Sequence, residues 1–179
     1  MARPRLTGVL LVGGASTRFG SPKALARLDR ETLAERAWRL LGEACDERLA
    51  VGKAADRLPL PFPVVDDGID ARLPAAGLVA GLRAAANDVC VFLPVDCPLV
   101  SAAALRALGE ACADAAVPAT GDPLPAAYRK TALDVLERRA AGGLSVRGAL
   151  AELDVRAVEL DQALLANVNT PADLERLRA

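Results

Sequence analysis

The stretch Leu6–Leu25, LTGVLLVGGASTRFGSPKAL, decides the fold of this chain. It begins with the apolar run Leu6–Val12, which is typical of a strand buried on both faces within a parallel sheet. Two adjacent glycines, Gly13 and Gly14, come next and allow the backbone to turn sharply and to approach a ligand closely. The backbone N–H groups of such a turn can line a concavity that holds an anion.

Two cations, Arg18 and Lys23, follow the glycines and place positive charge beside the turn. A buried strand, a glycine-rich loop and then cations together predict a binding site for a nucleotide polyphosphate. The spacing excludes two better-known phosphate loops. A P-loop has lysine directly after its last glycine, whereas Ser21 and Pro22 separate Gly20 from Lys23, and the G-x-G-x-x-G dinucleotide pattern does not fit. The alternative is an ordinary strand–helix turn with two surface cations.

The composition predicts one packed domain spanning residues 1–179, since 179 residues with 53% hydrophobic content can bury a sizeable core. A formal net charge of −1 argues against binding to nucleic acid or a membrane surface through bulk charge. No apolar run approaches the roughly 20 residues that a transmembrane helix needs, and the N-terminus lacks signal-peptide features. We therefore expect a cytoplasmic protein.

The chain contains no histidine, which excludes Ser-His-Asp and Cys-His catalysis and histidine-based zinc sites. The chemistry must then depend on carboxylates, cations, backbone amides or a bound metal. None of the four cysteines forms a C-x-x-C pair, so we expect buried, reduced thiols. Of these thiols, Cys97 is the one beside a candidate site, and packing is the favoured role for it. The others are Cys45, Cys90 and Cys112.

Helical and strand patterns alternate along the chain without internal repeats, which predicts a doubly wound α/β fold with a mostly parallel, mixed sheet flanked by helices. Glycines four apart on the helix at 74–87, Gly77 and Gly81, allow close packing against a strand or a nucleotide. Proline in the segment 123–129 predicts an edge strand there. Helices are expected at 31–45, 74–87, 101–113, 131–141, 145–153 and 172–178, and further strands at 47–52, 63–66, 89–95, 116–119 and 155–160.

A second candidate group follows the buried strand at 89–95, which leads directly into Asp96. Parallel α/β sheets bind ligands at the carboxyl ends of their strands, where the loop 13–23 is also expected. A single carboxylate acting together with substrate phosphates is a usual way to hold Mg²⁺. Asp96 is therefore a candidate metal ligand, and a turn cap is the alternative.

The first loop resembles the opening motif of the molybdenum cofactor guanylyltransferase family, L-[AV]-G-G-x-S-x-R-[MF]-G-x-x-K-A-L. Further segments resemble motifs of that family in the same order: LPAAGLVAGL at 73–82, VDCPLV at 95–100, PLPAAY at 123–128 and NVNTPADL at 167–174. The resemblance runs over nearly the whole chain. It implies a Rossmann-like nucleotidyltransferase fold and an enzyme that transfers GMP from GTP to the terminal phosphate of molybdopterin, with Mg²⁺ as cofactor and pyrophosphate as the second product.

The resemblance also implies roles for individual residues. It assigns catalysis to Arg18, Lys23 and Asp96, with Asp96 as the magnesium ligand. Asn167 and Asn169 match positions near the metal or the pterin acceptor, although a cap before the last helix also explains this segment. The implied nucleotide-binding residues are Leu11, Val12, Gly13, Gly14, Gly20, Lys23, Gly77 and one of Asp66 and Asp67.

Two departures concern the base-binding region. Leu73 replaces the first glycine of the family's G-P-L-A-G segment, and Ala75 replaces its leucine. Gly13 stands where the related molybdopterin cytidylyltransferases carry alanine, which favours guanine over cytosine. Transfer of CMP, another small-molecule nucleotidyltransferase and a nucleotide-binding module without catalysis remain alternatives. The expected partners are GTP and a molybdopterin-type phosphate acceptor, without nucleic acid or membrane. A monomer is expected, and an oligomer is the alternative.

Overall fold

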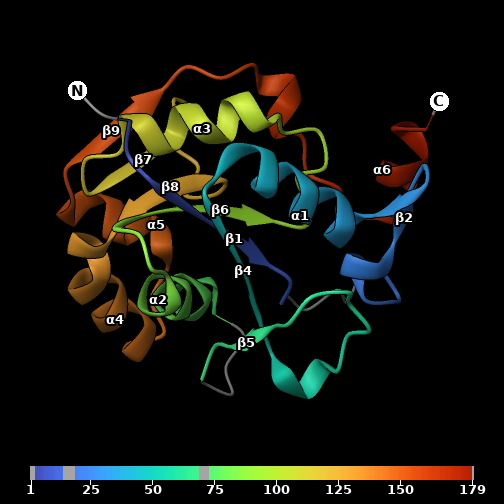
Figure 1. Ribbon diagram of the computed structural model, residues 1–179, viewed down its shortest axis with the longest axis horizontal. Helices are drawn as coiled ribbons and strands as arrows, with labels where there is room; N and C mark the ends of the chain where they lie inside the picture. The colour runs from blue at the N-terminus through green and yellow to red at the C-terminus, as the bar shows by residue number, and fades with distance from the viewer. Residues whose placement is uncertain (1–2, 14–18, 69–72, 179) are drawn as a thin grey trace.

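The computed structural model describes residues 3–13, 19–68 and 73–178. Its centre is a seven-stranded mixed sheet with the strand order β5-β4-β1-β6-β8-β7-β9, and a small antiparallel hairpin is formed by β2 and β3 (Figure 1). The strands are β1 (Leu6–Leu11), β2 (Arg27–Leu28), β3 (Glu31–Thr32), β4 (Glu47–Gly52), β5 (Val65–Asp66), β6 (Val89–Pro94), β7 (Ala115–Pro118), β8 (Ala126–Arg129) and β9 (Val155–Val158). The helices are α1 (Leu33–Ala44), α2 (Pro74–Ala84), α3 (Ala102–Ala111), α4 (Leu133–Ala141), α5 (Val146–Ala149) and α6 (Pro171–Arg176).

Strand β1 lies in the middle of the sheet and pairs in parallel with both β4 and β6. All six of its residues are buried. Side chains alternate between the two faces of the sheet, so Leu6 and Leu10 join one hydrophobic cluster while Val9 and Leu11 join the other. The apolar run at the start of the chain therefore supplies both halves of the core, as its continuous hydrophobicity predicted.

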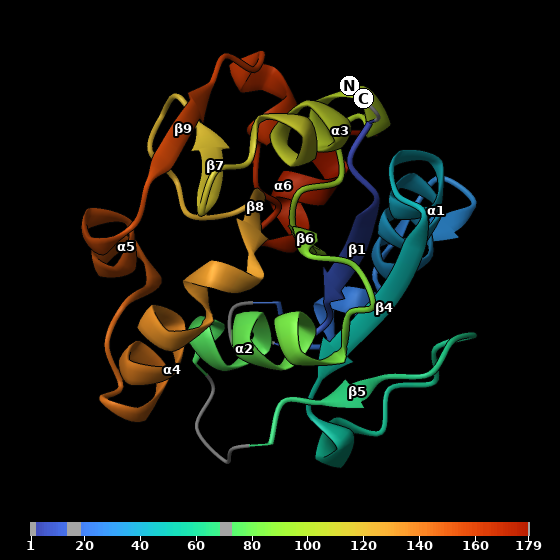
Figure 2. The same ribbon diagram turned by 60° about the vertical axis from the view of Figure 1, so that its left-hand side comes forward.

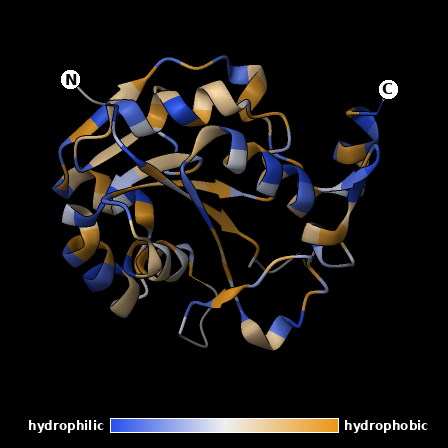
Figure 3. Cartoon of the chain, viewed as in Figure 1, coloured by the Kyte–Doolittle hydropathy of each residue, from blue (hydrophilic) through white to orange (hydrophobic). Residues whose placement is uncertain are grey.

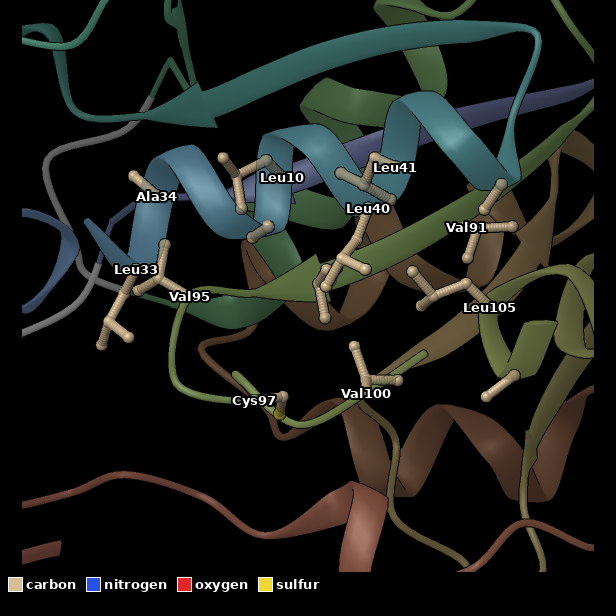
Figure 4. Packing of buried hydrophobic residues seen from close by; sticks show 14 of the residues in the cluster. Leu10, Leu33, Ala34, Leu40, Leu41, Val91, Val95, Cys97, Val100 and Leu105 are labelled. Carbon is tan, nitrogen blue, oxygen red and sulfur yellow. The ribbon is translucent and has the colours of Figure 1, made fainter. Parts of the chain in front are cut away.

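Helices cover both faces of this sheet (Figures 1 and 2). One face packs against α1 and α3, and the other against α2, α4 and α5. Figure 4 shows the first of these layers, with side chains of α1 meeting those of β1 and β6. The outer helices carry hydrophilic and hydrophobic residues in turn along their length (Figure 3), because only one side of each faces the sheet. The predicted doubly wound α/β class is confirmed.

Local sequence signals account for two of the contacts that place the helices. Helix α1 begins with a capping box, in which the Thr32 hydroxyl accepts from the Glu35 amide at 3.1 Å and the Glu35 carboxylate accepts from the Thr32 amide at 2.8 Å. In α2, a Cβ at Gly81 would lie 2.7 Å from Cε1 of Phe92 and 2.8 Å from Cγ1 of Val9. Glycine thus lets α2 pack directly on β1 and β6.

The prediction that the strand at 123–129 lies at an edge of the sheet is wrong. Strand β8 lies inside the sheet, antiparallel to both β6 and β7, and β9 forms that edge. The prolines do not interrupt the ladder because Pro123 and Pro125 both precede the strand, whose first residue is Ala126. The hairpin of β2 and β3 was not predicted, since each of its strands has only two residues.

In the ranges that the structure describes, no helix has both the length and the apolar character needed to cross a bilayer.

Candidate active site

A cleft of about 310 Å³ opens where parallel strands β1, β4 and β6 reach their carboxyl ends. The strand ends and the first turn of α2 supply most of its walls. The lining residues are Leu11, Gly13, Val51, Gly52, Lys53, Asp67, Leu73, Pro74, Gly77, Pro94, Asp96, Leu124 and Asn167. The cleft thus lies at the edge of the sheet where ligands of open α/β folds bind.

Two glycines let β1 and β4 come close together where both strands end at the cleft. Gly13 and Gly52 face each other, and a Cβ at Gly13 would lie 3.4 Å from Cα of Gly52. The amide of Val12 donates to Val51 O at 2.9 Å and keeps the two strand ends together. A Cβ at Gly52 would lie 2.7 Å from Cγ2 of Val12, so glycine at these two positions lets the ends of β1 and β4 pack closely against each other.

Lys23 and Asp96 lie side by side at the cleft although 73 residues separate them. Lys23 Nζ is 3.4 Å from Asp96 Oδ2 and 3.3 Å from Asn169 Oδ1. The side chain of Lys23 is 14% exposed and that of Asp96 is 28% exposed, so the pair is partly shielded from solvent. Lys23 begins a short 3₁₀ helix, Lys23–Leu25, directly after Pro22.

The C-terminal segment 167–169 docks against the residues that follow β6. Val168 donates its amide to Asp96 O at 2.8 Å, and its side chain is buried. The Cys97 thiol contacts Asn167 Oδ1 at 3.0 Å and Asp96 Oδ1 at 3.7 Å. Desolvation by burial, and then the nearby Asp96 carboxylate, raise the pKa of the Cys97 thiol, so it stays protonated and can donate.

A capping box on α6 holds this same segment from the other side. The Asp173 carboxylate accepts from the amides of Asn169 at 2.9 Å and Thr170 at 2.8 Å. These backbone hydrogen bonds lower the pKa of Asp173 from 3.8 to about 2, because they stabilise the charged form. Asn169 is therefore fixed at its backbone by Asp173 and contacted at its side chain by Lys23.

A second ion pair, between Lys53 and Asp67, also lines the cleft. Lys53 Nζ lies 2.6 Å from Asp67 Oδ1, and the side chains are only 10% and 9% exposed. The neighbouring Asp66 has a different position: its carboxylate accepts from the amides of Ala54 at 2.6 Å and Gly68 at 2.7 Å, which lowers its pKa. Of the two candidate acids, Asp67 lines the cleft and Asp66 caps turns beside it.

A second hollow of about 250 Å³ adjoins the cleft. The two share Leu124 and Asn167 as wall residues. The rest of its lining comes from the end of β7, the following turn and the segment before 167, namely Pro118, Asp122, Pro123 and Leu165. A ligand bound in one space would therefore be separated from a ligand in the other by two side chains.

The structure brings many of the predicted site residues together, but not all of them. Leu11, Gly13, Asp67, Gly77, Asp96 and Asn167 line the cleft, and Lys23 and Asn169 meet beside Asp96. The side chain of Val12 is buried in the core, and Gly20 is an exposed turn residue with φ +73°. Arg18 and Gly14 fall outside the described residues.

Sequence reasoning missed Lys53, which lies between the strands expected at 47–52 and 63–66 and was not a candidate site residue. A usable signal existed, because Lys53 directly follows β4, and the carboxyl end of a parallel strand is where ligands bind. The rule that residues at the carboxyl ends of parallel strands bind ligands predicts Asp96, and applied to β4 it would also have predicted Lys53.

The oxygen groups around Asp96 suit a hard divalent cation. Its carboxylate and the side-chain oxygen of Asn169 both lie close to Lys23 Nζ, and Mg²⁺ prefers oxygen ligands. Over residues 3–13, 19–68 and 73–178 there is no cluster of three or more histidine, cysteine or acidic side chains that could hold a metal unaided. Such a site fits an ion whose remaining ligands come from water and substrate phosphates.

Comparisons with known proteins agree with this geometry. Residues 8–158 match the sequence model of the MobA-like NTP transferase domain. A Rhodopirellula baltica protein named probable molybdenum cofactor guanylyltransferase is 32% identical over 193 residues, covering 97% of this chain and 92% of that relative. A molybdenum cofactor guanylyltransferase of Desulfosudis oleivorans is 30% identical over 191 residues, covering 97% and 95%. The crystal structure of molybdopterin-guanine dinucleotide biosynthesis protein A from Archaeoglobus fulgidus matches with a TM-score of 0.81 and 27% identity, covering 96% of both chains.

Proposed function

The chain belongs to the MobA-like NTP transferase domain family, and from that premise we propose that it transfers GMP from GTP to the terminal phosphate of a molybdopterin-type acceptor. The relatives named as molybdenum cofactor guanylyltransferases align over almost their whole length, which supports this substrate pair. One observation carries the proposal. Lys23 Nζ and Asp96 Oδ2 lie 3.4 Å apart at the carboxyl edge of the sheet, beside a cleft located where α/β folds bind nucleotides.

In the proposed reaction, an oxygen of the acceptor's phosphate attacks the α-phosphorus of GTP. A new P–O bond forms, the bond between the α-phosphorus and the bridging oxygen to the β-phosphate breaks, and pyrophosphate leaves with the bonding electrons. The nucleophile is a phosphate oxygen that is already ionised near neutral pH, so the reaction needs no general base. This agrees with a chain that contains no histidine.

The residues of the chain then act by positioning and by neutralising charge. Lys23 would stabilise the negative charge of the departing pyrophosphate, and the strand ends at Gly13 and Gly52, which line the cleft, would border the bound nucleotide. Arg18 is proposed as a second cation at the phosphates. Asn167, on the wall between the two hollows, would face the acceptor phosphate.

We propose Mg²⁺ as the cofactor, with Asp96 as its protein ligand and Asn169 beside it. When bound, the ion supplies positive charge to the nucleotide phosphates and stabilises charge that develops at the α-phosphorus. The donor set of one carboxylate and one amide oxygen supports this choice, as does the cleft of about 310 Å³ that Asp96 lines.

The test is an assay of purified protein with Mg²⁺, molybdopterin and each of GTP, CTP, ATP and UTP. We expect pyrophosphate release with GTP, and mass spectrometry should find GMP attached to the acceptor. Turnover selective for CTP would contradict the guanine assignment. GTP binding without pyrophosphate release in the presence of the acceptor would contradict catalysis and favour a nucleotide-binding module.

A thermal-shift panel with the same nucleotides and Mg²⁺ separates binding from turnover. A ligand present at a hundredfold excess over its Kd stabilises the native state by about 2.7 kcal/mol. Selective stabilisation by GTP is the expected result.

A further inference from the structure

A buried cysteine thiol holds one of the two residues that separate the cleft from the adjoining hollow. Cys97 is 2% exposed and lies within the hydrophobic cluster that includes Val95 and Val100 (Figure 4). Its Sγ is 3.0 Å from Oδ1 of Asn167, an exposed side chain 70 residues further along the chain. The same Sγ lies 3.7 Å from Asp96 Oδ1, so Asn167 provides the nearer of its two polar contacts, and packing alone does not account for them.

The contact determines which end of the Asn167 amide is available to a ligand. A side-chain amide offers one accepting oxygen and an NH₂ group with two donors. With Oδ1 turned toward the S–H group, the NH₂ group is left for ligands in the two hollows that Asn167 borders. A flipped amide would turn its NH₂ group toward sulfur, which accepts hydrogen bonds only weakly, so the thiol favours the orientation with Oδ1 facing it.

The backbone around this pair is fixed as well. The amide of Val168 donates to Asp96 O at 2.8 Å, which ties the residue after Asn167 to the residue before Cys97. The side chain of Val168 is 1% exposed. With the main chain held, the torsion of the Asn167 side chain is the remaining freedom, and this is the freedom that the thiol limits.

We propose that Cys97 is a positioning residue, whose thiol orients Asn167 so that its NH₂ group donates to the phosphate monoester of the acceptor. This inference rests on the proposed function, since it takes the nucleotide to occupy the cleft and the acceptor to occupy the adjoining hollow. The reacting acceptor phosphate must then stand beside the wall between them, which Asn167 forms together with Leu124. A hydrogen bond to a charged phosphate is stronger than one between neutral groups, and an amide that is already oriented loses less freedom when it binds.

The first test compares Cys97→Ala, Cys97→Ser, Asn167→Ala and the double variant by steady-state kinetics with molybdopterin and GTP. Cys97→Ala should raise the KM for the acceptor about fivefold, as expected for loss of one neutral hydrogen bond, and leave the KM for GTP unchanged. Cys97→Ser retains a donor and should restore the acceptor KM to within about twofold of the wild type. Asn167→Ala, which removes a donor to a charged group, should raise it about 20-fold.

The double variant decides whether the thiol acts through the amide. If it does, Cys97→Ala adds nothing further in the Asn167→Ala background, because coupled residues are not additive. A further fivefold loss in that background would overturn the proposal, and so would a serine variant as impaired as the alanine variant.

Cys112→Ala is the matched control for packing. Cys112 is another buried thiol of the same hydrophobic cluster, and its Sγ contacts the backbone oxygen of Ala113 at 3.6 Å rather than any residue of the cleft. Both alanine variants should lower the melting temperature by similar amounts, but only Cys97→Ala should change the acceptor KM. An equal kinetic effect in both would show that lost packing, not orientation, is the cause.

A second readout does not depend on activity. In ¹H–¹⁵N spectra, the side-chain NH₂ resonances of Asn167 can be assigned by their loss in Asn167→Ala. They should shift in Cys97→Ala and stay close to the wild-type positions in Cys97→Ser, and no shift in Cys97→Ala would overturn the contact. If the wild-type protein transfers no GMP, the proposed function fails, while these resonances still decide whether the thiol orients the amide.

Discussion

Lys23 Nζ and Asp96 Oδ2 lie 3.4 Å apart, and they reach this distance from the carboxyl ends of neighbouring strands β1 and β6. Parallel pairing of these strands requires both following loops to leave the sheet at the same edge. The partly shielded pair places a cation next to a candidate metal ligand. A charged substrate that binds here meets both groups at once.

Replacing Lys23 with alanine should lower kcat for GMP transfer by about 10² or more, by analogy with the loss of one charge-stabilising donor. The reason is that Lys23 would neutralise charge on the departing pyrophosphate. Single-turnover measurement of pyrophosphate release checks this. Lys130→Ala is a matched control. Lys130 Nζ donates to Ala85 O at 2.7 Å, and neither residue is among those that line the cleft. Near-normal turnover by the Lys23 variant would refute the role.

Replacing Asp96 with asparagine should weaken Mg²⁺-dependent GTP binding at least tenfold, because the amide keeps the shape of the carboxylate but lacks its charge. Isothermal titration with GTP, with and without Mg²⁺, measures the difference. Asp88→Asn provides the control. Asp88 directly precedes the amino end of β6, whereas Asp96 follows its carboxyl end, and Asp88 pairs with Arg129 at 2.5 Å. Unchanged magnesium dependence in the Asp96 variant would remove this residue as the metal ligand.

The sequence predicted those parts of the site that depend on local rules. The apolar run of β1 predicts a central strand, and a strand followed by glycine or by an acid predicts groups at the ligand-binding edge. Gly13 and Asp96 both line the cleft on these grounds. The family resemblance pointed to Asn169, which lies beside Lys23 across a separation of 146 residues.

The remaining features depend on which segments become neighbours in space. Periodicity cannot show that β5 pairs with β4, and this pairing accompanies the contact of Asp67 with Lys53. Strand β8 was placed at an edge because of its prolines, yet Pro125 precedes the ladder and the strand lies inside the sheet. The contact of Cys97 with Asn167 likewise depends on how the C-terminal segment docks.

The ion pair of Lys53 and Asp67 gives a prediction about stability. Its side chains are 10% and 9% exposed, so Lys53→Met leaves a buried carboxylate without this partner and should destabilise the fold by about 3 kcal/mol. The double variant with Asp67→Leu should recover much of that loss, because it leaves neither charge of the pair behind. Urea unfolding measures both, and equal stability losses in the single and double variants would contradict a buried pair.

The capping carboxylate of Asp173 gives a prediction about pH. Hydrogen bonds from the amides of Asn169 and Thr170 lower its pKa from 3.8 to about 2. A depressed pKa in the folded state stabilises the fold above pH 3.8, and this contribution is lost as the pH falls toward 2. Asp173→Asn should therefore melt at a lower temperature than the wild type near neutral pH, and the gap should close within that acidic window.

Melting temperatures followed by circular dichroism across a pH series test this directly. Glu175→Gln is the control, because Glu175 lies on the same helix and its carboxylate pairs with Arg178. Its melting temperature should track the wild type at every pH. A gap between wild type and Asp173→Asn that persists unchanged to pH 2 would show that the carboxylate's charge does not hold the backbone of Asn169 in place.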